Sequence, residues 1–145
     1  MEIKVTLEEL HKVAQDIVQK AKDAQADTAT VITLEGDLGS GKTTLTQEVA
    51  RILGVKESVI SPTFVIMKKY EVVDTIFKHL IHIDAYRLNE SKELINLGWE
   101  ELLADKTNLI IIEWPSQVPE CIPGNACRID LSHSEDNTRV IKFNY

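Results

Sequence analysis

Cysteine is scarce in this 145-residue chain, which contains only Cys121 and Cys127. The two thiols flank a Pro-Gly turn, and no further Cys or His lies near enough in sequence to complete a zinc site. No signal-peptide pattern precedes them. They are therefore expected to be reduced thiols, one in a loop and one at the start of a strand, and we assign them no chemistry.

Long hydrophobic runs, internal repeats and linkers are also missing. No apolar stretch approaches the roughly 20 residues that a membrane-spanning helix needs. No Pro- or Ser-rich segment divides the chain, and the N-terminal residues Met1 to Lys4 lack the layout of a signal peptide. These absences predict a single domain over residues 1–145, with no membrane contact and a cytoplasmic location.

Basic residues are outnumbered, with 16 Lys and Arg against 23 Asp and Glu, which gives a formal net charge of −7. Because an acidic chain repels phosphate backbones on average, tight nucleic-acid binding by this chain alone is disfavoured unless a local basic patch exists. Hydrophobic residues make up 43% and charged residues 27% of the sequence, which is the balance of a globular protein. Disordered, collagen-like and coiled-coil classes are thereby excluded.

Alternating helical and strand-like patterns predict an α/β protein. Thr6 and Glu9 form a capping-box pattern at the start of an apolar helical repeat that runs from Leu7 to Ala21. Further helices are expected at 42–53, with Gly54 as the C′ residue, and at 91–104. Strands are expected at 30–35, 64–73, 76–84, 109–112, 128–131 and 139–143, with turns at 74–75 and 133–137. The pattern predicts a three-layer α/β/α fold around a mixed, partly antiparallel sheet.

The strongest motif is Gly36-Asp37-Leu38-Gly39-Ser40-Gly41-Lys42-Thr43, a full match to G-x-x-x-x-G-K-[ST]. It follows a predicted strand and opens a predicted helix, which is the context that this motif requires. The glycines allow backbone N–H groups to surround an anion at the positive end of the helix. Lys42 is expected to reach the β- and γ-phosphates of a nucleotide, and the Thr43 hydroxyl to bind Mg²⁺.

A phosphate loop also needs an acidic group at the end of a nearby strand to hold the metal or its waters. Two candidates fit: Glu113, which ends the apolar strand at 109–112, and Asp84, which ends the strand at 76–84. Thr63, in the turn Ser61-Pro62-Thr63-Phe64, is a candidate to present a hydroxyl toward a γ-phosphate or its water.

Four blocks in series resemble the TsaE family, the bacterial ATPases of tRNA threonylcarbamoyladenosine biosynthesis. The resemblance covers roughly residues 31–115, and the helical segment 97–101 also resembles this family. The blocks are Gly36 to Thr44, Ser61-Pro62-Thr63-Phe64, His82-Ile83-Asp84-Ala85-Tyr86-Arg87-Leu88 and Ile112-Glu113-Trp114-Pro115.

The resemblance implies a role for each matched position. Gly39 to Thr44 would surround ATP, Thr43 and Glu113 would bind Mg²⁺, and Asp84 would hold the metal's waters or orient the attacking water. Thr63 would belong to a loop that senses the γ-phosphate. Trp114 would lie near the nucleotide as a stacking partner or as a core residue. Arg87 would stabilise charge or form a salt bridge at the surface or with a partner.

The resemblance also implies partners. The family acts with TsaB and TsaD, which transfer the threonylcarbamoyl group to adenosine 37 of ANN-decoding tRNAs while TsaE hydrolyses ATP. The chain would therefore meet tRNA indirectly, through the complex. No obvious arginine finger completes the site, so turnover is expected to be slow alone and faster with partners.

The main alternative is a small-molecule P-loop kinase. Such an enzyme needs a lid with several arginines to exclude water, whereas Arg87, Arg128 and Arg139 are scattered. A regulatory GTPase is disfavoured, because the strand-end Asp-x-x-Gly and the guanine-reading Asn-Lys-x-Asp motifs are absent. A non-enzymatic subunit that only binds ATP overlaps with the family role and differs in whether hydrolysis is needed.

Overall fold

The computed structural model describes residues 1–24, 26–37, 39–60, 66–73, 76–134 and 136–144. Three predicted features lie outside these residues: Leu38 of the phosphate loop, the segment 61–65 that contains Ser61 and Thr63, and the hairpin turn at 74–75. Among the described residues, no helix combines the length and the apolar character that a bilayer crossing requires.

Seven strands form one mixed sheet in the order β1-β7-β6-β2-β5-β4-β3. Its centre is parallel, because β2 pairs with β5 and β6, and β5 pairs with β4; the β1–β7, β6–β7 and β3–β4 pairs are antiparallel. The strands are β1 (Glu2–Val5), β2 (Thr30–Glu35), β3 (Met67–Glu71), β4 (His79–Asp84), β5 (Asn108–Glu113), β6 (Cys127–His133) and β7 (Arg139–Asn144).

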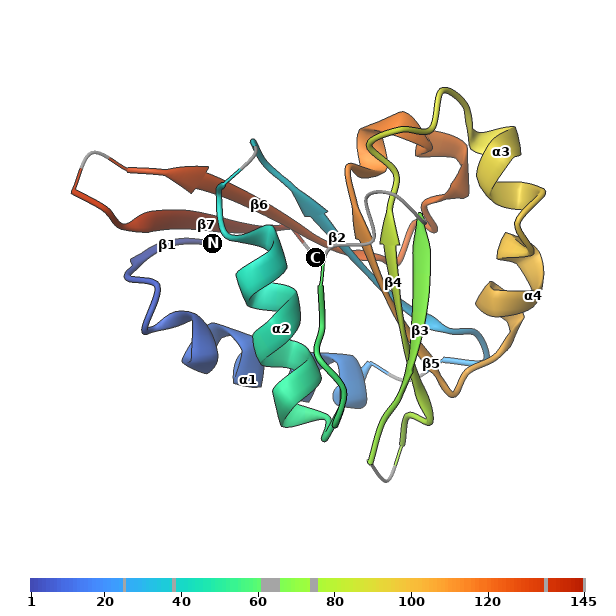
Figure 1. Cartoon of the computed structure of the whole chain (residues 1–145), viewed down its shortest axis with the longest axis horizontal. Coiled ribbons are helices and arrows are strands. Elements are labelled where there is room, and N and C mark those ends of the chain that lie inside the picture. The colour runs from blue at the N-terminus through green and yellow to red at the C-terminus, as the bar shows by residue number, and fades with distance from the viewer. Residues whose placement is uncertain (25, 38, 61–65, 74–75, 135, 145) are drawn as a thin grey trace.

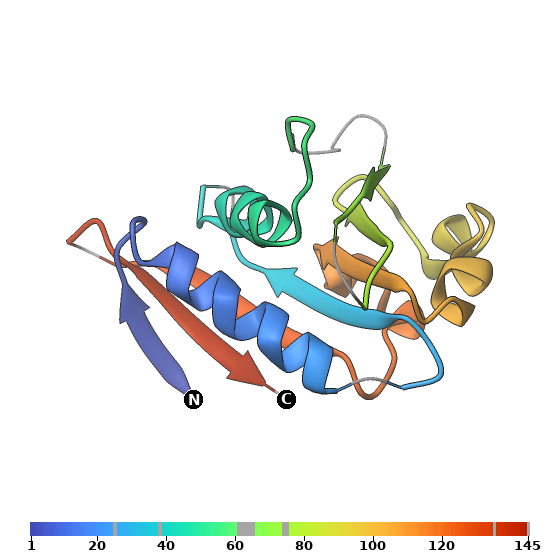
Figure 2. The same cartoon turned by 90° about the horizontal axis from the view of Figure 1, so that it is seen from below.

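Helices cover both faces of this sheet (Figures 1 and 2), which confirms the layered α/β prediction. On one face pack α1 (Leu10–Asp23) and α2 (Lys42–Ile52), and on the other α3 (Ser91–Ile95) and α4 (Trp99–Ala104). Two short 3-10 turns, Pro115–Gln117 and Pro119–Cys121, follow β5.

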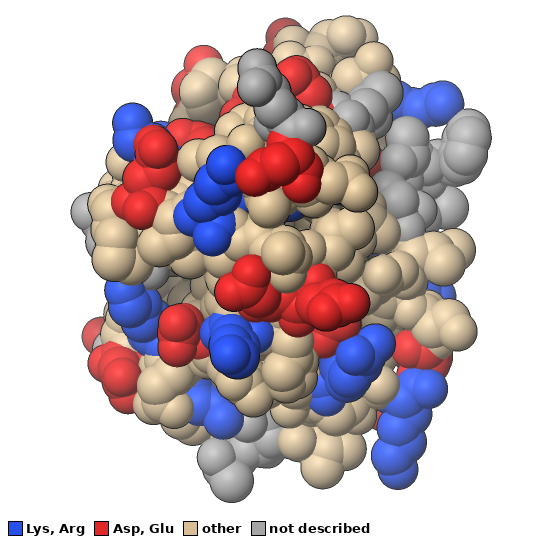
Figure 3. Space-filling model, turned by 90° about the vertical axis from the view of Figure 1, so that its left-hand side faces the viewer, with Lys and Arg blue, Asp and Glu red and all other residues tan. Residues whose placement is uncertain are grey.

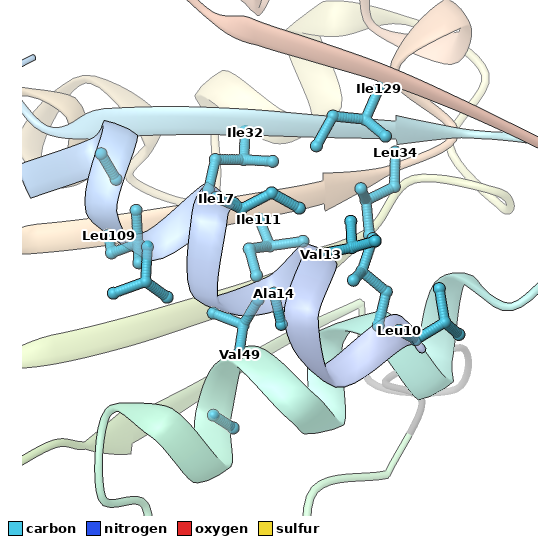
Figure 4. Close-up of a cluster of buried hydrophobic side chains, with 14 of the residues drawn as sticks. Leu10, Val13, Ala14, Ile17, Ile32, Leu34, Val49, Leu109, Ile111 and Ile129 are labelled. Atoms are coloured by element: carbon cyan, nitrogen blue, oxygen red, sulfur yellow. The ribbon is translucent and has the colours of Figure 1, made fainter. Parts of the chain in front are cut away.

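The apolar core consists of two clusters, one on each face of the sheet, because successive side chains of the central strands point to opposite faces. In β5, Leu109 and Ile111 join the α1–α2 side, whereas Ile110 and Ile112 join the α3–α4 side. Figure 4 shows α1 laying its apolar stripe over β2 and β5 on the first side. Every residue of β5 is buried, as expected of a β-branched strand that is covered on both faces.

The first helix begins later than its apolar repeat. The capping box is confirmed, since the Glu9 amide donates to Thr6 Oγ1 at 3.3 Å and the Thr6 amide donates to Glu9 Oε1 at 3.1 Å. Leu7, however, precedes the helix and is 45% exposed. Its assignment to the apolar face is wrong, because the capping turn directs the chain outward before the first helical turn.

Several predicted boundaries need correction. The expected helix at 91–104 is two helices, because Gly98 lies between them in a left-handed conformation (φ 93°). Within the described parts of the expected strands at 64–73 and 76–84, the structure has the shorter strands β3 and β4. Their antiparallel pairing is confirmed. β1 was not predicted, since only one of its four residues is buried and its pairing with β7 is long-range.

Gly98 offers a test of the break between α3 and α4. A Cβ at this position would meet nothing within 4 Å, so only the left-handed backbone resists a side chain. Gly98→Ala is expected to lower the free energy of unfolding by about 1–2 kcal/mol. Gly124→Ala is the matched control, because its Cβ also meets nothing and its φ is not left-handed. Urea denaturation of both variants measures the difference in their unfolding midpoints. Equal midpoints would contradict the backbone strain that we assign to position 98.

Candidate functional site

The phosphate loop lies at the carboxyl edge of the parallel strands. It leaves β2 directly and leads into α2, as Figure 1 shows. In the strand register, Leu34 of β2 pairs with Glu113 of β5, and Glu113 pairs with Asp84 of β4. Both predicted carboxylates therefore lie in one row beside the loop, which is where ligands bind in open parallel sheets.

Two glycines of the loop have left-handed backbones, Gly39 (φ 80°) and Gly41 (φ 107°). Gly41 is the N-cap of α2, and no side chain caps this helix end. The first four amides of a helix have no carbonyl partner within the helix, so the amides at Lys42 and Thr43 belong to an uncapped, positively polarised end. Such an end binds phosphate or another anion.

Gly36 is required by close packing. A Cβ on this residue would lie 2.3 Å from the backbone oxygen of Leu131 and 2.7 Å from Ser40 Oγ. The loop is thus pressed against β6, which pairs with β2 on the side opposite β5. Ser40 Oγ is buried and has no hydrogen-bond partner among the described residues.

Lys42 is 5% exposed and lies within this loop. Its Nζ donates to the backbone oxygen of Gly36 and, at 3.3 Å, to that of Asp37. Burial lowers the pKa of Lys42, and the carboxylates of Glu113 and Asp84 act in the opposite direction. The ammonium therefore lies close enough to both carboxylates to be influenced by them, in a site with little water.

Trp114 closes one side of the lysine. Lys42 Nζ lies 4.2 Å from the centroid of the indole ring, a cation–π distance. Trp114 itself has a left-handed backbone (φ 59°), which is unusual for a bulky residue, and its amide donates to the Leu34 oxygen at 3.2 Å. Its ring also packs on Tyr86, with centroids 5.0 Å apart.

The two carboxylates are held differently. Asp84 is 4% exposed, and its Oδ1 accepts a hydrogen bond from the Tyr86 amide at 3.0 Å. Glu113 is 3% exposed, and its Oε2 lies 2.5 Å from Nε2 of the fully buried His82. His82 was not selected from the sequence as a site residue, although its i, i+2 spacing to Asp84 on one strand places both side chains on the same face.

The other predicted positions divide into three groups. Thr43 and Thr44 are half-buried in the first turn of α2, next to Lys42. Asp37 is exposed at the loop, and Arg87 is exposed after β4. Leu38 and Thr63 lie outside the described residues.

Both cysteines are free thiols. Burial raises the pKa of Cys127 to about 11 and also raises that of Cys121. A thiol with a raised pKa is a poor nucleophile at neutral pH.

The chain is similar to known proteins over most of its length. Residues 5–141 match the family model described as "Threonylcarbamoyl adenosine biosynthesis protein TsaE". The tRNA threonylcarbamoyladenosine biosynthesis protein TsaE of Bacillus subtilis (strain 168) is 36% identical over 126 residues, 87% of this chain and 76% of that protein. The protein of the same name from Rickettsia conorii is 33% identical over 135 residues, 92% of this chain and 71% of that protein.

A solved structure is also similar. The crystal structure of Bacillus subtilis YdiB superimposes with a TM-score of 0.72 at 32% sequence identity, covering 99% of this chain and 84% of the other. The likeness extends over the sheet and both helical layers.

Gly36→Ala tests whether the loop needs its contact with β6. The added Cβ would clash with the Leu131 oxygen. The loop must therefore shift, and its amide N–H groups would no longer point at the bound phosphate. One lost hydrogen bond to a charged group is worth about 1.5–3 kcal/mol, so binding of a nucleoside triphosphate should weaken about tenfold or more. Fluorescence titration measures this, with circular dichroism as a check of folding. Wild-type affinity in the alanine variant would contradict the packing argument.

Proposed function

The chain belongs to the TsaE family, and from this we propose that it is an ATP-binding and ATP-hydrolysing subunit for threonylcarbamoylation of adenosine 37 in ANN-decoding tRNAs. It acts with TsaB and TsaD in the cytoplasm, as a single P-loop ATPase domain over residues 1–145. The observation that carries the proposal is the row of Leu34, Glu113 and Asp84 beside the buried ammonium of Lys42. A phosphate loop, a lysine and strand-end carboxylates are the parts that P-loop ATPases share.

ATP binding is assigned to the loop from Gly36 to Thr44, including Asp37, Leu38, Gly39, Ser40 and Gly41. The uncapped amides of α2 receive phosphate oxygens. Lys42 then exchanges its bonds to the carbonyls of Gly36 and Asp37 for bonds to the β- and γ-phosphates. Trp114 lies beside this lysine and restricts water access to it.

The residues present fit Mg²⁺. Thr43, Glu113 and Asp84 offer a hydroxyl and two carboxylates, the hard oxygen donors that this ion prefers. Among the described residues, no group of three or more His, Cys, Asp or Glu side chains could hold a metal by itself. This is consistent with an ion bound through one or two carboxylates together with substrate phosphates. When bound, Mg²⁺ supplies positive charge to the β- and γ-phosphate oxygens.

Hydrolysis requires a water in line with the β–γ bond. Asp84 is buried at the strand end and anchored by the Tyr86 amide, so it can orient that water and accept its hydrogen bond. Thr63, which lies outside the described residues, is proposed to contribute a hydroxyl. The water attacks the γ-phosphorus, the bond to the bridging oxygen breaks, and ADP and phosphate leave while Lys42 and the loop amides stabilise the charge.

Turnover by the chain alone should be slow. Arg87 is exposed, and Nη1 of Arg139 donates to the backbone oxygens of Asn137 and Thr138. A partner could supply the missing positive charge. On the face viewed in Figure 3, basic and acidic side chains are interspersed, which favours leaving most tRNA contact to TsaB and TsaD.

ATP turnover measured alone and with the TsaB–TsaD pair tests the proposal. Weak activity should rise about 10³–10⁵-fold with the pair, which is the range that a supplied charge gives in related systems. Lys42→Ala should remain inactive in both conditions, since it removes the charge that reaches the phosphates. Turnover that is indifferent to the pair would contradict the proposal and favour a small-molecule P-loop kinase, to be sought by a metabolite screen.

Glu113→Ala tests the metal assignment separately. The variant removes a carboxylate donor but leaves the phosphate loop intact, so ATP affinity in Mg²⁺ should fall about 10-fold or more. Affinity in excess EDTA should remain within about twofold of wild type, because no metal contributes there. Isothermal titration under both conditions measures the difference. Equal losses with and without Mg²⁺ would remove Glu113 from the metal site.

A further inference from the structure

His82 is a fully buried polar residue that the mechanism above does not use. It lies on β4, between the edge strand β3 and β5, at 0% exposure. The alternation of β4 places it on the same face as Leu80, and Leu80 belongs to the cluster under α1 and α2. The imidazole therefore faces the side of the sheet that carries the phosphate loop helix.

The sheet register brings this imidazole to Glu113. His82 pairs with Ile111 across the β4–β5 ladder, and Ile111 and Glu113 share one face of β5. His82 and Glu113 are thus diagonal neighbours, a separation that long side chains bridge. The result is the 2.5 Å contact between His82 Nε2 and Glu113 Oε2.

The second ring nitrogen has no such contact. His82 Nδ1 is buried and has no hydrogen-bond partner among the described residues. A buried ring nitrogen without a hydrogen bond costs free energy, and an apolar side chain at this position would avoid that cost. Packing alone therefore does not account for a histidine here. The polar contact that this residue makes is the one to Glu113, so its chemistry is directed at that carboxylate.

We propose that His82 is a positioning residue: its Nε2–H donates to Glu113 Oε2 and holds the carboxylate in one orientation beside Lys42 and Thr43, ready to receive a divalent cation. This inference rests on the proposed function, because it assigns a role toward the metal site of that function. A glutamate has three rotatable side-chain bonds, and a ligand held in advance loses less freedom on binding. Hydrogen-bonded neighbours of ligating carboxylates typically change metal affinity about 10–100-fold.

The contact between His82 and Glu113 also keeps the Glu113 carboxylate apart from the Lys42 ammonium. Glu113 is the carboxylate with the largest influence on Lys42, yet Lys42 Nζ donates to the carbonyls of Gly36 and Asp37. With Oε2 engaged by His82, the carboxylate does not close onto the ammonium. Both groups therefore remain available, one for a cation and the other for phosphate.

Three substitutions separate positioning from packing. His82→Gln keeps an amide N–H near the place of Nε2, His82→Asn carries the same amide one methylene shorter, and His82→Leu has no donor. The probe is Mn²⁺, followed by electron paramagnetic resonance, in the presence of a non-hydrolysable ATP analogue. Affinity for the analogue in EDTA is measured in parallel and should stay within about twofold in all variants that fold.

The expected order is specific. The Asn and Leu variants should bind Mn²⁺ about 10–100-fold more weakly than wild type, and the Gln variant should lie within about threefold of it. If the Leu variant does not fold, the Gln–Asn pair carries the comparison. Wild-type Mn²⁺ affinity in the Asn variant, or a Gln variant as weak as the Asn variant, would overturn the role of His82 while the proposed function stands. A wild-type chain that binds no analogue, or no Mn²⁺ with it, would overturn the proposed function and this inference together.

Discussion

The site depends on the register of three parallel strands. β2, β5 and β4 end together, so Leu34, Glu113 and Asp84 form one row at the carboxyl edge. Two buried carboxylates at this row are unfavourable by themselves, because a charge removed from water must be paired or hydrogen-bonded. Lys42, His82 and the Tyr86 amide supply those interactions. A shift of one residue in either ladder would send Glu113 or Asp84 to the opposite face.

The loop depends on a second constraint, which comes from the other side of β2. β6 runs parallel to β2 and places the Leu131 oxygen where a Cβ of Gly36 would be. The loop is therefore supported by the C-terminal half of the chain, although its motif lies in the first third of the sequence. The β6–β7 hairpin and β1 extend the sheet on this side, and the amide of Phe143 donates to the oxygen of Met1. Both chain ends are thus tied into the structure that holds the loop.

In the proposed ATPase, the chain itself builds the phosphate site, and a partner supplies part of the positive charge. The α2 amides are uncapped, so they can receive phosphate oxygens directly, whereas Lys42 must first give up its bonds to the carbonyls of Gly36 and Asp37. Stabilising the transferring phosphoryl group takes more charge than one lysine and one cation provide. Under the proposed function, ATP turnover would be coupled to assembly with partners, because we propose that hydrolysis becomes fast only when they are in place.

Local signals determined much of this molecule. The β-branched run at 30–35, the capping box at Thr6 and the glycine-lysine motif were readable in the sequence, because each depends on residues close together in the chain. The role of Gly98 as a break, the exposure of Leu7 and the existence of β1 were not, since they depend on backbone conformation or on pairing with distant β7. The sequence placed Glu113 and Asp84 each at the end of a strand, and tertiary structure alone decided that they are adjacent. The same holds for His82, whose partner lies 31 residues away: sheet register is a long-range property, and it determines which polar groups meet.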